Sequence, residues 1–508
     1  MSAPALNAFP AGSSASLRGE SAAAAHATAS SGSRKAAWIL WLLFVVTLPL
    51  VNPWVRGDGV GYYAYVRSLL IEHKLDFQND WRAANTSFTM GRVHADGTID
   101  PRQYTRTGEL DNHFAVGASI LWTPFELATH AVTSVAHKLG VHVQPNGLSR
   151  PYIVTMALAT ALYGFFGLYL SFQFAARYVE ERWALLATVG IWFASSLPVY
   201  MYFNPSWSHA HSVFVVALYL WYWQRTRGTR TTGQWVLLGL ISGLVLDVYY
   251  VNIAVLLVGL MESLQAYWRY LRADHKEWAQ AGHLFTGNVQ YCFATIVAFL
   301  PTLVTRKIIY GNPFDFGYTE AGGWSLASPH LLSALFSSDH GCLVWTPILI
   351  LAIVGLILFL KRDRTLATYL IVVVAAFCYL IGGDPNWAGI SSFGNRFFIS
   401  LTPLFVLGLA ALFSELAKWV KNDRRAFRIA SAAIAVFIVW NLAFIFQWGI
   451  HMVPARGPIS WKQMVRNQFV VPQRSVTTFE AYLQNRHGLM QQIEQQDVQQ
   501  LKAEYNHK

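Results

Sequence analysis

A succession of long apolar runs constrains this chain more than any other feature. A spanning helix needs about 20 predominantly apolar residues, and its backbone groups must bond within the helix because lipid offers them no partner. The chain is 54% hydrophobic and 13% charged, whereas soluble domains carry about 25% charged residues. The sequence therefore predicts an all-α polytopic membrane protein. The apolar runs lie at 36–50, 114–135, 151–175, 184–202, 207–223, 234–247, 249–267, 289–305, 343–360, 366–381, 397–414 and 427–448.

The residues before the first run have no apolar periodicity. Residues 1–35 are rich in Ala and Ser, which is typical of a disordered leader. Arg34 and Lys35 precede the run 36–50, as in a signal peptide, but no clear small-residue cleavage site follows it. We therefore expect an uncleaved signal anchor whose N-terminus lies inside the cell.

The run at 114–135 decides the topology of everything after it. If it does not cross the membrane, the basic loops lie inside and the loops without Lys or Arg lie outside, as the positive-inside bias requires. If it crosses, every assignment inverts. Gly117, Pro124 and Glu126 interrupt the run, which fits an interfacial helix. We therefore expect about eleven spans. The short outer connections without Lys or Arg are 203–206, 248, 310–341 and 382–395.

This topology divides the chain into three parts. They are the leader 1–35, a transmembrane module 36–448, and an outer C-terminal tail 449–508. The module contains one long outer loop, 55–150, which holds the interfacial helix 114–135. The tail is polar and Gln-rich, and it is too small to form an independent enzyme.

The long outer loop opens with an aspartate set among glycines and tyrosines. The segment Arg56–Tyr65 reads RGDGVGYYAY, which places Asp58 within a few residues of the predicted membrane surface. The flanking glycines allow backbone or ligand to approach closely. Asp58 also lies where a helix should begin, since 60–70 carries apolar residues at helical spacing. Two compatible roles follow for Asp58, a general base acting on a lipid-borne substrate or an N-cap.

Four short segments carry a resemblance to a known superfamily. They are Gly57–Tyr65, Asn204–His211 (NPSWSHAH), Ser337–Pro347 (SSDHGCLVWTP) and Trp387–Arg396 (WAGISSFGNR). Together with the signal anchor and the inside-basic loops, they resemble the GT-C glycosyltransferases, in particular bacterial relatives of the protein O-mannosyltransferases and the lipid A aminoarabinose transferases. The resemblance covers about 40–450 in outline.

The resemblance implies a transfer reaction in the cytoplasmic (inner) membrane of a bacterium, with the tail in the periplasm. A sugar would move from a polyprenyl-phosphate donor to a glycan, lipid or protein acceptor on the outer face. Asp58 would be the general base, and Tyr62 of the same motif would contact substrate. Many GT-C enzymes carry a second acidic residue in the second outer loop, where this chain has His209 and His211. That departure favours a mechanism without a metal cofactor, although a divalent metal stays an alternative.

A departing lipid phosphate needs cations at the outer membrane edge. Arg396 opens an apolar span and is the only basic residue at its outer loop, so it is the first candidate, since a guanidinium forks onto phosphate oxygens. Arg306 and Lys307 close another span and are further candidates, with snorkelling as the alternative role. His340 lies in a loop on the same predicted side, where it could donate to phosphate or pair with Asp339.

The other candidates carry weaker signals. His209 and His211 lie two residues apart and face different ways on a helix, so hydrogen bonding is expected of them rather than paired zinc ligation. Asp384 precedes Pro385 in a turn-like run and is either a turn former or a second acid. Three cysteines give neither a disulfide framework nor a metal spacing. The net charge of +11 comes from loops between apolar runs and is accompanied by no nucleic-acid-reading motif.

Two other classes compete with a glycosyltransferase. A transporter or flippase of a lipid-linked or polar substrate would also have many spans, but it should show internal repeats and broken helices at mid-membrane. A scaffold protein would need no site at all. Convergence of the outer-edge candidates on one cavity would favour the enzyme, whereas acids along a through-channel would favour transport.

Overall fold

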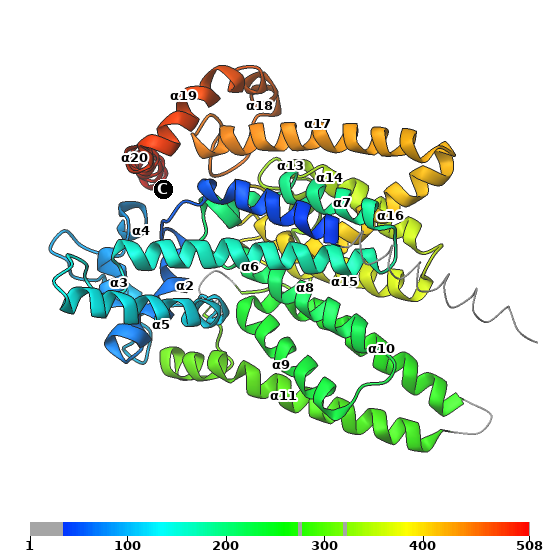
Figure 1. Ribbon diagram of the computed structural model, residues 1–508. Coiled ribbons are helices and arrows are strands. Elements are labelled where there is room, and N and C mark those ends of the chain that lie inside the picture. The colour runs from blue at the N-terminus through cyan, green and yellow to red at the C-terminus, as the bar shows by residue number, and fades with distance from the viewer. Residues whose placement is uncertain (1–33, 273–276, 318–322, 507–508) are drawn as a thin grey trace, which may run out of the picture. The chain divides into compact units, whose positions relative to one another are not determined.

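The computed structural model describes residues 34–272, 277–317 and 323–506, and throughout these ranges the chain is helical or irregular, with two isolated bridges in place of strands. It falls into two compact units, Met1–Val46 and Thr47–Lys508. The first contains most of a helix over 34–47, and the predicted leader 1–35 lies almost wholly outside the described residues. The second unit contains everything discussed below (Figure 1).

The elements of the second unit follow one another in this order. They are η1 (Leu48–Leu50), α2 (Asp58–Arg67), η2 (Ser68–Glu72), α3 (Gln78–Ala83), α4 (Thr86–Thr89), η3 (Pro101–Gln103), α5 (Gly117–Lys138), α6 (Arg150–Ala176), α7 (Glu181–Phe193), η4 (Val199–Phe203), α8 (His209–Thr226), α9 (Thr232–Val248), η5 (Tyr250–Asn252), α10 (Ile253–Arg272), α11 (Trp278–Tyr310), α12 (Leu331–Phe336), α13 (Cys342–Trp345), α14 (Ile348–Phe359), α15 (Arg364–Gly382), η7 (Arg396–Leu401), α16 (Thr402–Val420), α17 (Asp423–Gly449), α18 (Trp461–Gln468), α19 (Val471–Gln484) and α20 (Arg486–Asn506).

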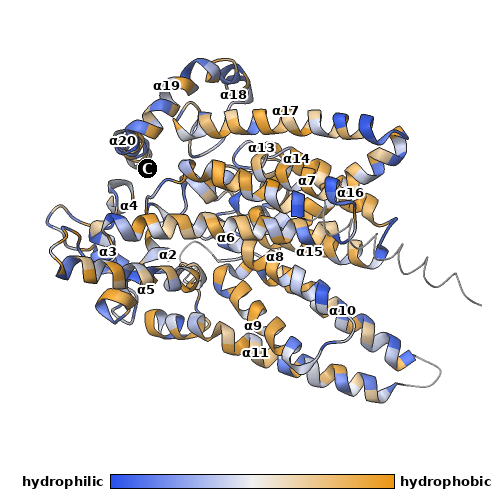
Figure 2. Cartoon of the chain, viewed as in Figure 1, coloured by the Kyte–Doolittle hydropathy of each residue, from blue (hydrophilic) through white to orange (hydrophobic). Residues whose placement is uncertain are grey.

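Within the described ranges, six helices are long and apolar enough to cross a membrane, which makes this a multi-pass membrane protein. Figure 2 shows the hydrophobic residues along these helices, and in α17 they fill the middle of the helix while hydrophilic residues gather at one end. The six are Arg150–Ala176, Tyr250–Arg272, Trp278–Tyr310, Arg364–Gly382, Arg396–Val420 and Asp423–Gly449.

These six helices do not confirm the predicted number of about eleven spans, and two of the apolar runs do not form one continuous helix. The run 343–360 is split at Pro347, which lies between α13 and the 12-residue α14. The run 184–202 ends as a helix at Phe193, before Ser195 and Ser196, and resumes as a short π-helical segment. A 12-residue helix is only about 18 Å long, which is shorter than the hydrocarbon core of a bilayer.

The predicted interfacial helix is present as α5, a 22-residue helix with Pro124 inside it. It is not among the six candidate spans. Glu126 of this helix is buried, and Trp122 donates a hydrogen bond from its indole to Thr160 of α6 at 2.9 Å. Its placement outside the bilayer core stays a prediction.

Small residues allow the central helices to pack closely. Gly355 of α14 and Gly408 of α16 face each other, and a Cβ built on Gly355 would lie 1.8 Å from the carbonyl oxygen of Gly408. No larger residue fits either position without separating the two helices. Close backbone approach at small residues is a common way to pack helices in membranes, where the hydrophobic effect contributes little.

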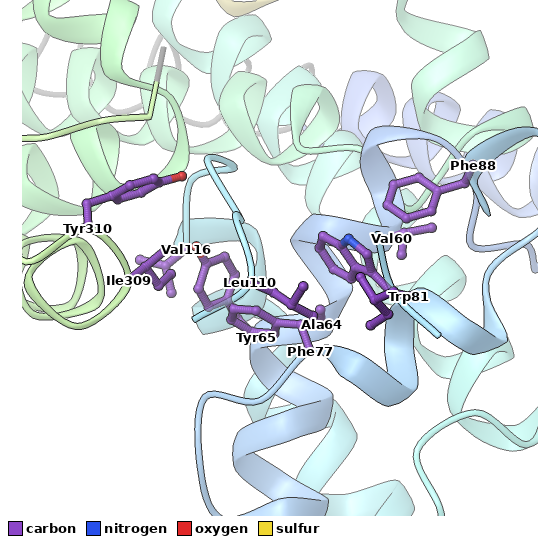
Figure 3. Close-up of a cluster of buried hydrophobic side chains, with 11 residues drawn as sticks. Val60, Ala64, Tyr65, Phe77, Trp81, Phe88, Leu110, Val116, Ile309 and Tyr310 are labelled. Carbon is purple, nitrogen blue, oxygen red and sulfur yellow. The ribbon is translucent and has the colours of Figure 1, made fainter. Parts of the chain in front are cut away.

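The long outer loop has a hydrophobic core of its own, which holds α2. Tyr65 and Val60 of α2 pack in one buried cluster with Phe77 and Trp81 of the loop and with Ile309 of α11 (Figure 3). The rings of Tyr65 and Phe77 meet edge to face at 5.2 Å. This cluster therefore ties the helix that begins at Asp58 both to its own loop and to the end of α11.

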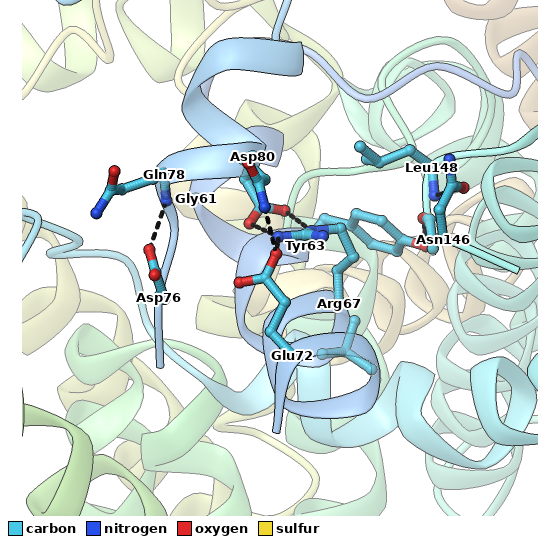
Figure 4. Close-up of polar contacts among 12 residues, drawn as sticks. Gly61, Tyr63, Arg67, Glu72, Asp76, Gln78, Asp80, Asn146 and Leu148 are labelled. Carbon is cyan, nitrogen blue, oxygen red and sulfur yellow. Dashed lines mark hydrogen bonds and ion pairs between the residues drawn. The ribbon is translucent and has the colours of Figure 1, made fainter. Parts of the chain in front are cut away.

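A buried ion pair fixes the other end of α2. The Arg67 guanidinium donates to both carboxylate oxygens of Asp80, at 2.5 and 2.6 Å, and to Glu72 at 2.6 Å (Figure 4). Tyr63 donates its hydroxyl proton to the Gly147 carbonyl at 2.8 Å. A two-pronged, desolvated pair of this kind sets one orientation for the helix, because breaking it leaves a buried charge without its partner.

The tail folds into α18, α19 and α20 and docks on the long outer loop (Figure 1). Glu494 of α20 accepts hydrogen bonds from the Ser87 backbone at 2.6 Å and from the Asn85 side chain at 2.9 Å. Asp497 of α20 pairs with Arg56 and accepts from His451 at 2.9 Å. The tail is thus part of the same compact unit as the segment that carries Asp58.

Candidate functional site

Asp58 forms an ion pair with Arg396. One carboxylate oxygen, Oδ2, lies 2.7 Å from Nη2 of Arg396. Helix α2 begins at Asp58 itself, its N-cap is Gly57 at φ 53°, and no side chain caps it. The N-cap role considered for Asp58 is therefore wrong, because the carboxylate faces Arg396 instead of the free amides of its own helix.

Two glycines let α2 approach the rest of the site. A Cβ on Gly59 would lie 1.9 Å from the Ser206 hydroxyl oxygen, and one on Gly61 would lie 2.0 Å from the Phe114 ring. Neither position has room for a methyl group. The alternating glycines of the RGDGVG segment therefore bring Asp58 close to the loop that precedes α8.

Arg396 is held by aromatic rings on two sides. It opens η7, and its guanidinium carbon lies 4.3 Å from the centre of the Trp207 ring and 5.3 Å from that of Phe397. Its side chain is 9% exposed, against 29% for that of Asp58. A guanidinium held in this low-dielectric setting attracts an anion more strongly than one in water would.

The Asp58–Arg396 pair belongs to the lining of two cavities. The first, which we call the aromatic cavity, has a volume of about 660 Å³ and is walled by Tyr249, Phe397 and residues of the loop after α11. The second, the polar cavity, has a volume of about 430 Å³ and lies between the long outer loop and the tail. Asp58 and Arg396 line both cavities. A group transferred from one cavity to the other would therefore pass beside this pair.

Of the six further site candidates, three line the aromatic cavity. These are Tyr62, His209 and Asp384. Burial and the neighbouring Asp58 raise the pKa of Tyr62, so its hydroxyl is a neutral donor. Asp384 accepts a hydrogen bond from the Asn386 amide at 2.8 Å, as expected of a turn former, and burial raises its pKa. His209 lies within an aromatic cluster, 4.9 Å from the Tyr200 ring centre.

Arg306 and Lys307 lie elsewhere. Arg306 is buried, donates to the Phe114 carbonyl at 2.9 Å and to the Tyr65 hydroxyl, and so ties α11 to the long outer loop. Lys307 is exposed and donates to the Gly311 carbonyl at 2.9 Å, which caps the end of α11. The structure gives both residues structural partners and places neither in the lining of the aromatic or the polar cavity.

His340 is also outside the two cavity linings. Its ring is fully buried, stacks on Trp345 with ring centres 4.5 Å apart, and lies 3.6 Å from the carboxylate of Asp339. Burial, with a smaller contribution from the charge of Arg396, lowers the pKa of His340 to about 3. The imidazole is therefore neutral at physiological pH, and it packs against Trp345 outside the lining of both cavities.

The structure adds residues that the sequence did not single out. Trp207 lines the polar cavity, stacks on Arg396, and donates from its indole to the Arg56 carbonyl at 3.0 Å. His113 and Phe114 line both cavities. Trp207 lies within the NPSWSHAH segment that carried the resemblance, so its position was a usable signal. The sequence contained no such signal for His113, because this residue follows a polar stretch without periodicity.

The fold and the site define a multi-pass helical membrane protein with an acid–base pair between two cavities. In the described ranges, no three His, Cys, Asp or Glu side chains cluster in a way that could hold a metal ion.

No protein-family model matches the sequence, and no curated protein matches it. An oligosaccharyltransferase of Archaeoglobus fulgidus, solved in complex with Zn and sulfate, is similar at TM-score 0.48 and 13% identity, over 80% of this chain and 55% of that one. The oligosaccharyltransferase AglB of the same organism, in complex with an inhibitory peptide and a dolichol-phosphate, is similar at TM-score 0.45 and 12% identity, over 91% of this chain and 56% of that one. This chain thus spans little more than half the length of either.

Proposed function

We propose that this protein is a membrane-embedded glycosyltransferase that moves a sugar from a polyprenyl-phosphate donor to an acceptor hydroxyl on the outer face of a bacterial cytoplasmic membrane. The observation that carries the proposal is the Asp58–Arg396 pair at the boundary between two cavities. It offers a carboxylate for the acceptor and a guanidinium for the leaving phosphate at neighbouring positions. Glycosyl transfer needs both groups at the same place.

In this mechanism Asp58 is the general base. Its carboxylate takes the proton of the acceptor hydroxyl while the hydroxyl oxygen bonds to the anomeric carbon of the sugar. The bond from that carbon to the phosphate oxygen breaks, and its electron pair leaves on the phosphate. The positive charge that develops on the sugar ring resembles that of glycoside hydrolysis, and a nearby carboxylate stabilises it.

Arg396 would change partners during the reaction. In the absence of donor it holds Asp58 at 2.7 Å, so this contact occupies the carboxylate oxygen that faces the guanidinium. A donor phosphate offers the guanidinium a stronger, two-pronged partner. When the phosphate binds Arg396, Asp58 is released from this contact and its carboxylate can take the proton of the acceptor hydroxyl. Donor binding would thereby activate the base.

The aromatic cavity suits the donor better than the polar cavity does. Ile253 of α10 and Leu380 of α15 lie in its wall, and both helices are candidate spans along which a prenyl chain can approach. Tyr249 and Phe397, whose rings stack with centres 5.9 Å apart, both line this cavity. The polar cavity, between the long outer loop and the tail, then receives the acceptor.

The proposal is tested with the full chain reconstituted in lipid nanodiscs. Mass spectrometry of glycans and glycolipids from a deletion strain would identify the product and hence the donor sugar. Asp58→Asn should then reduce the rate of transfer on the order of a hundredfold to ten-thousandfold, which is the usual contribution of a general base to the rate. Asp96→Asn is the matched control, because Asp96 is an exposed aspartate of the same loop.

Two outcomes would overturn the proposal. One is an Asp58→Asn protein with near-normal transfer. The other is a deletion strain with unchanged glycans and glycolipids but a defect in the uptake or flipping of a lipid-linked solute, which would support the competing transporter hypothesis.

A further inference from the structure

Beside the polar cavity lies an apolar groove that the proposed function does not use. The groove has a volume of about 520 Å³ and runs between the end of α17 and α19, with Leu50 and Trp54 between them. Two of its few polar side chains are already bonded. Asn52 donates to the Phe203 carbonyl at 3.3 Å, and Tyr482 donates its hydroxyl proton to the Leu50 carbonyl at 2.7 Å. A sugar would find few partners here, whereas a hydrocarbon chain fits such a lining.

The position of the groove indicates which hydrocarbon is available. Its wall includes Leu442, Ile445 and Trp448, in the last turns of the candidate span α17. On the other side, α19 exposes Val476, Phe479 and Leu483 at helical spacing, with exposed fractions of 69%, 50% and 49%. A helix with an exposed apolar stripe beside the end of a span lies in the membrane interface. The rim of the groove is therefore at the level where acyl chains begin.

The groove is continuous with the site. Arg56, Asn204, Trp448 and Ile493 line both the groove and the polar cavity. The polar cavity in turn reaches Asp58. A molecule with its chain in the groove can therefore place a polar headgroup beside the carboxylate without passing through the aromatic cavity.

We infer that the acceptor is a membrane lipid, which seats an acyl chain in the groove between α17 and α19 and places a headgroup hydroxyl beside Asp58. This inference rests on the proposed function and names its acceptor. The headgroup hydroxyl loses its proton to Asp58, its oxygen bonds to the anomeric carbon, and the donor phosphate leaves with the electron pair of the broken bond. The product is a glycolipid that stays anchored by the same chain.

Two neighbouring threonines of α19 make a matched test. Thr478 lines the groove and is half-buried, whereas Thr477 is exposed and lies outside the lining. Thr478→Trp fills the groove, and Thr477→Trp adds the same bulk on the outside. The probe is a phosphatidylglycerol, whose headgroup carries free hydroxyls, with a diazirine in its acyl chain, photolysed in nanodiscs of phosphatidylethanolamine and phosphatidylglycerol that hold the full chain.

We expect crosslinks to map to Ile445, Phe479 and their neighbours in the groove, and to fall several-fold in Thr478→Trp but not in Thr477→Trp. Val476→Asp should act like Thr478→Trp without added bulk, because it places a carboxylate at the apolar rim. Size-exclusion profiles report the folding of each variant. Equal crosslinking in the two tryptophan variants, or crosslinks confined to outward-facing residues such as Leu483, would overturn the inference.

A second measurement separates this inference from the proposed function. Binding of a polyprenyl phosphate depends on Arg396, so it should be the same in Thr478→Trp and in the unmodified protein. If the groove holds no acyl chain but Asp58→Asn abolishes transfer to a protein or glycan, the lipid acceptor is wrong and the glycosyltransferase stands. If crosslinking behaves as expected but Asp58→Asn keeps its activity, the groove is a lipid site of a protein with another function.

Discussion

In the Asp58–Arg396 pair, the proposed donor phosphate competes with the Asp58 carboxylate for the Arg396 guanidinium. Arg396 can neutralise Asp58 or bind a donor phosphate, but its Nη2 contact at 2.7 Å already engages the carboxylate. A phosphate that approaches Arg396 therefore meets both a competitor for the guanidinium and a like charge. The resting pair lowers donor affinity, and it leaves the Asp58 carboxylate without its guanidinium partner only when the donor is present.

This competition predicts that Asp58→Asn binds a polyprenyl phosphate more tightly than the unmodified protein does. The asparagine keeps the shape of the side chain and removes the negative charge. One charge-assisted hydrogen bond is worth roughly 1.5 kcal/mol or more, so affinity should rise about tenfold. Microscale thermophoresis in detergent with a short-chain polyprenyl phosphate would measure it. Unchanged or weaker binding would mean that Asp58 and the phosphate do not compete for Arg396.

Replacement of Arg396 should weaken polyprenyl phosphate binding, which is the opposite of the effect expected for Asp58→Asn. Arg396→Ala should lose roughly tenfold or more in polyprenyl phosphate affinity, and Arg396→Lys should recover only part, because an ammonium cannot fork onto two oxygens. Arg424→Ala is the control, because Arg424 is exposed at the start of α17 and lines neither the aromatic nor the polar cavity. If Arg396→Ala binds the ligand normally, the phosphate lies elsewhere.

The glycines beside Asp58 predict a loss of transfer activity that a second substitution should restore. Gly59→Ala should displace the start of α2, because its new methyl group would lie 1.9 Å from the Ser206 oxygen and 2.4 Å from the Ser206 Cβ. Transfer should fall on the order of a hundredfold, as a shift of about 1 Å in a reacting group can cost. Ser206→Gly removes both colliding atoms, so the double variant should recover much of the activity.

Gly282→Ala in α11 is the control for this pair, since nothing lies within 4 Å of its added Cβ. A Gly59→Ala protein with full activity, or a double variant no better than Gly59→Ala alone, would show that the contact with Ser206 does not position Asp58.

At the scale of elements, the contact between α20 and the long outer loop depends on Asp497. Burial opposes ionisation of this carboxyl, but the hydrogen bond from His451 and the charge of Arg56 outweigh it and hold the pKa of Asp497 below its ordinary value. A group with a lowered pKa contributes stability above its unfolded pKa and loses it as pH falls. The docking of α20 should therefore be complete at neutral pH and weaken as pH drops below about 4.

Asp497→Asn should reproduce the acid effect at pH 7. Amide hydrogen exchange over 486–506 should become faster in the variant, and exchange over 402–420 should stay slow, because α16 does not contact the pair. Glu480→Gln is a suitable control, as Glu480 is an exposed acid on α19. Equal exchange in the two variants would show that α20 is held by other contacts, such as those of Glu494.

The sequence predicted the elements unevenly, for physical reasons. It placed Asp58 at the start of a helix and Arg396 at the start of a span, because glycines and apolar periodicity mark such boundaries. It did not predict that the run 343–360 breaks at Pro347, because an apolar run carries no record of such a break. It did not predict the docked tail, since contacts such as Arg56 with Asp497 join residues far apart in the chain without any local pattern.

The site residues show the same limit, because local patterns located them in the chain but did not show which of them meet in the fold. Asp58 and Arg396 were both found from their position at membrane edges, but that they face each other depends on how α2 packs against the loop before α8. Arg306 had the same edge position and yet donates to Tyr65 and the Phe114 carbonyl. Edge position alone therefore does not distinguish a ligand-binding arginine from one that ties two segments together.

At the scale of the whole molecule, the charge of the loops predicts which parts face the cytoplasm. The basic loops around 225–235 and 418–428 should be inside, and 310–341 and the tail outside, which requires that α5 does not cross the membrane. Ser325 and Thr232 are suitable reporters, because both are exposed. Thr231 is less suitable, since its side chain caps α9 by accepting a hydrogen bond from the Gln234 amide at 3.3 Å.

The topology is tested by cysteine labelling in intact spheroplasts with an impermeant maleimide. Cys292 is exposed and must first be replaced by alanine, whereas Cys342 and Cys378 are buried. We expect Ser325→Cys to label from outside and Thr232→Cys to label only after the membrane is opened. The Asp58 loop and the tail would then share the outer face with the proposed donor and acceptor. Labelling of Thr232→Cys from outside would invert the map, place α5 across the membrane, and move the site to the cytoplasmic face.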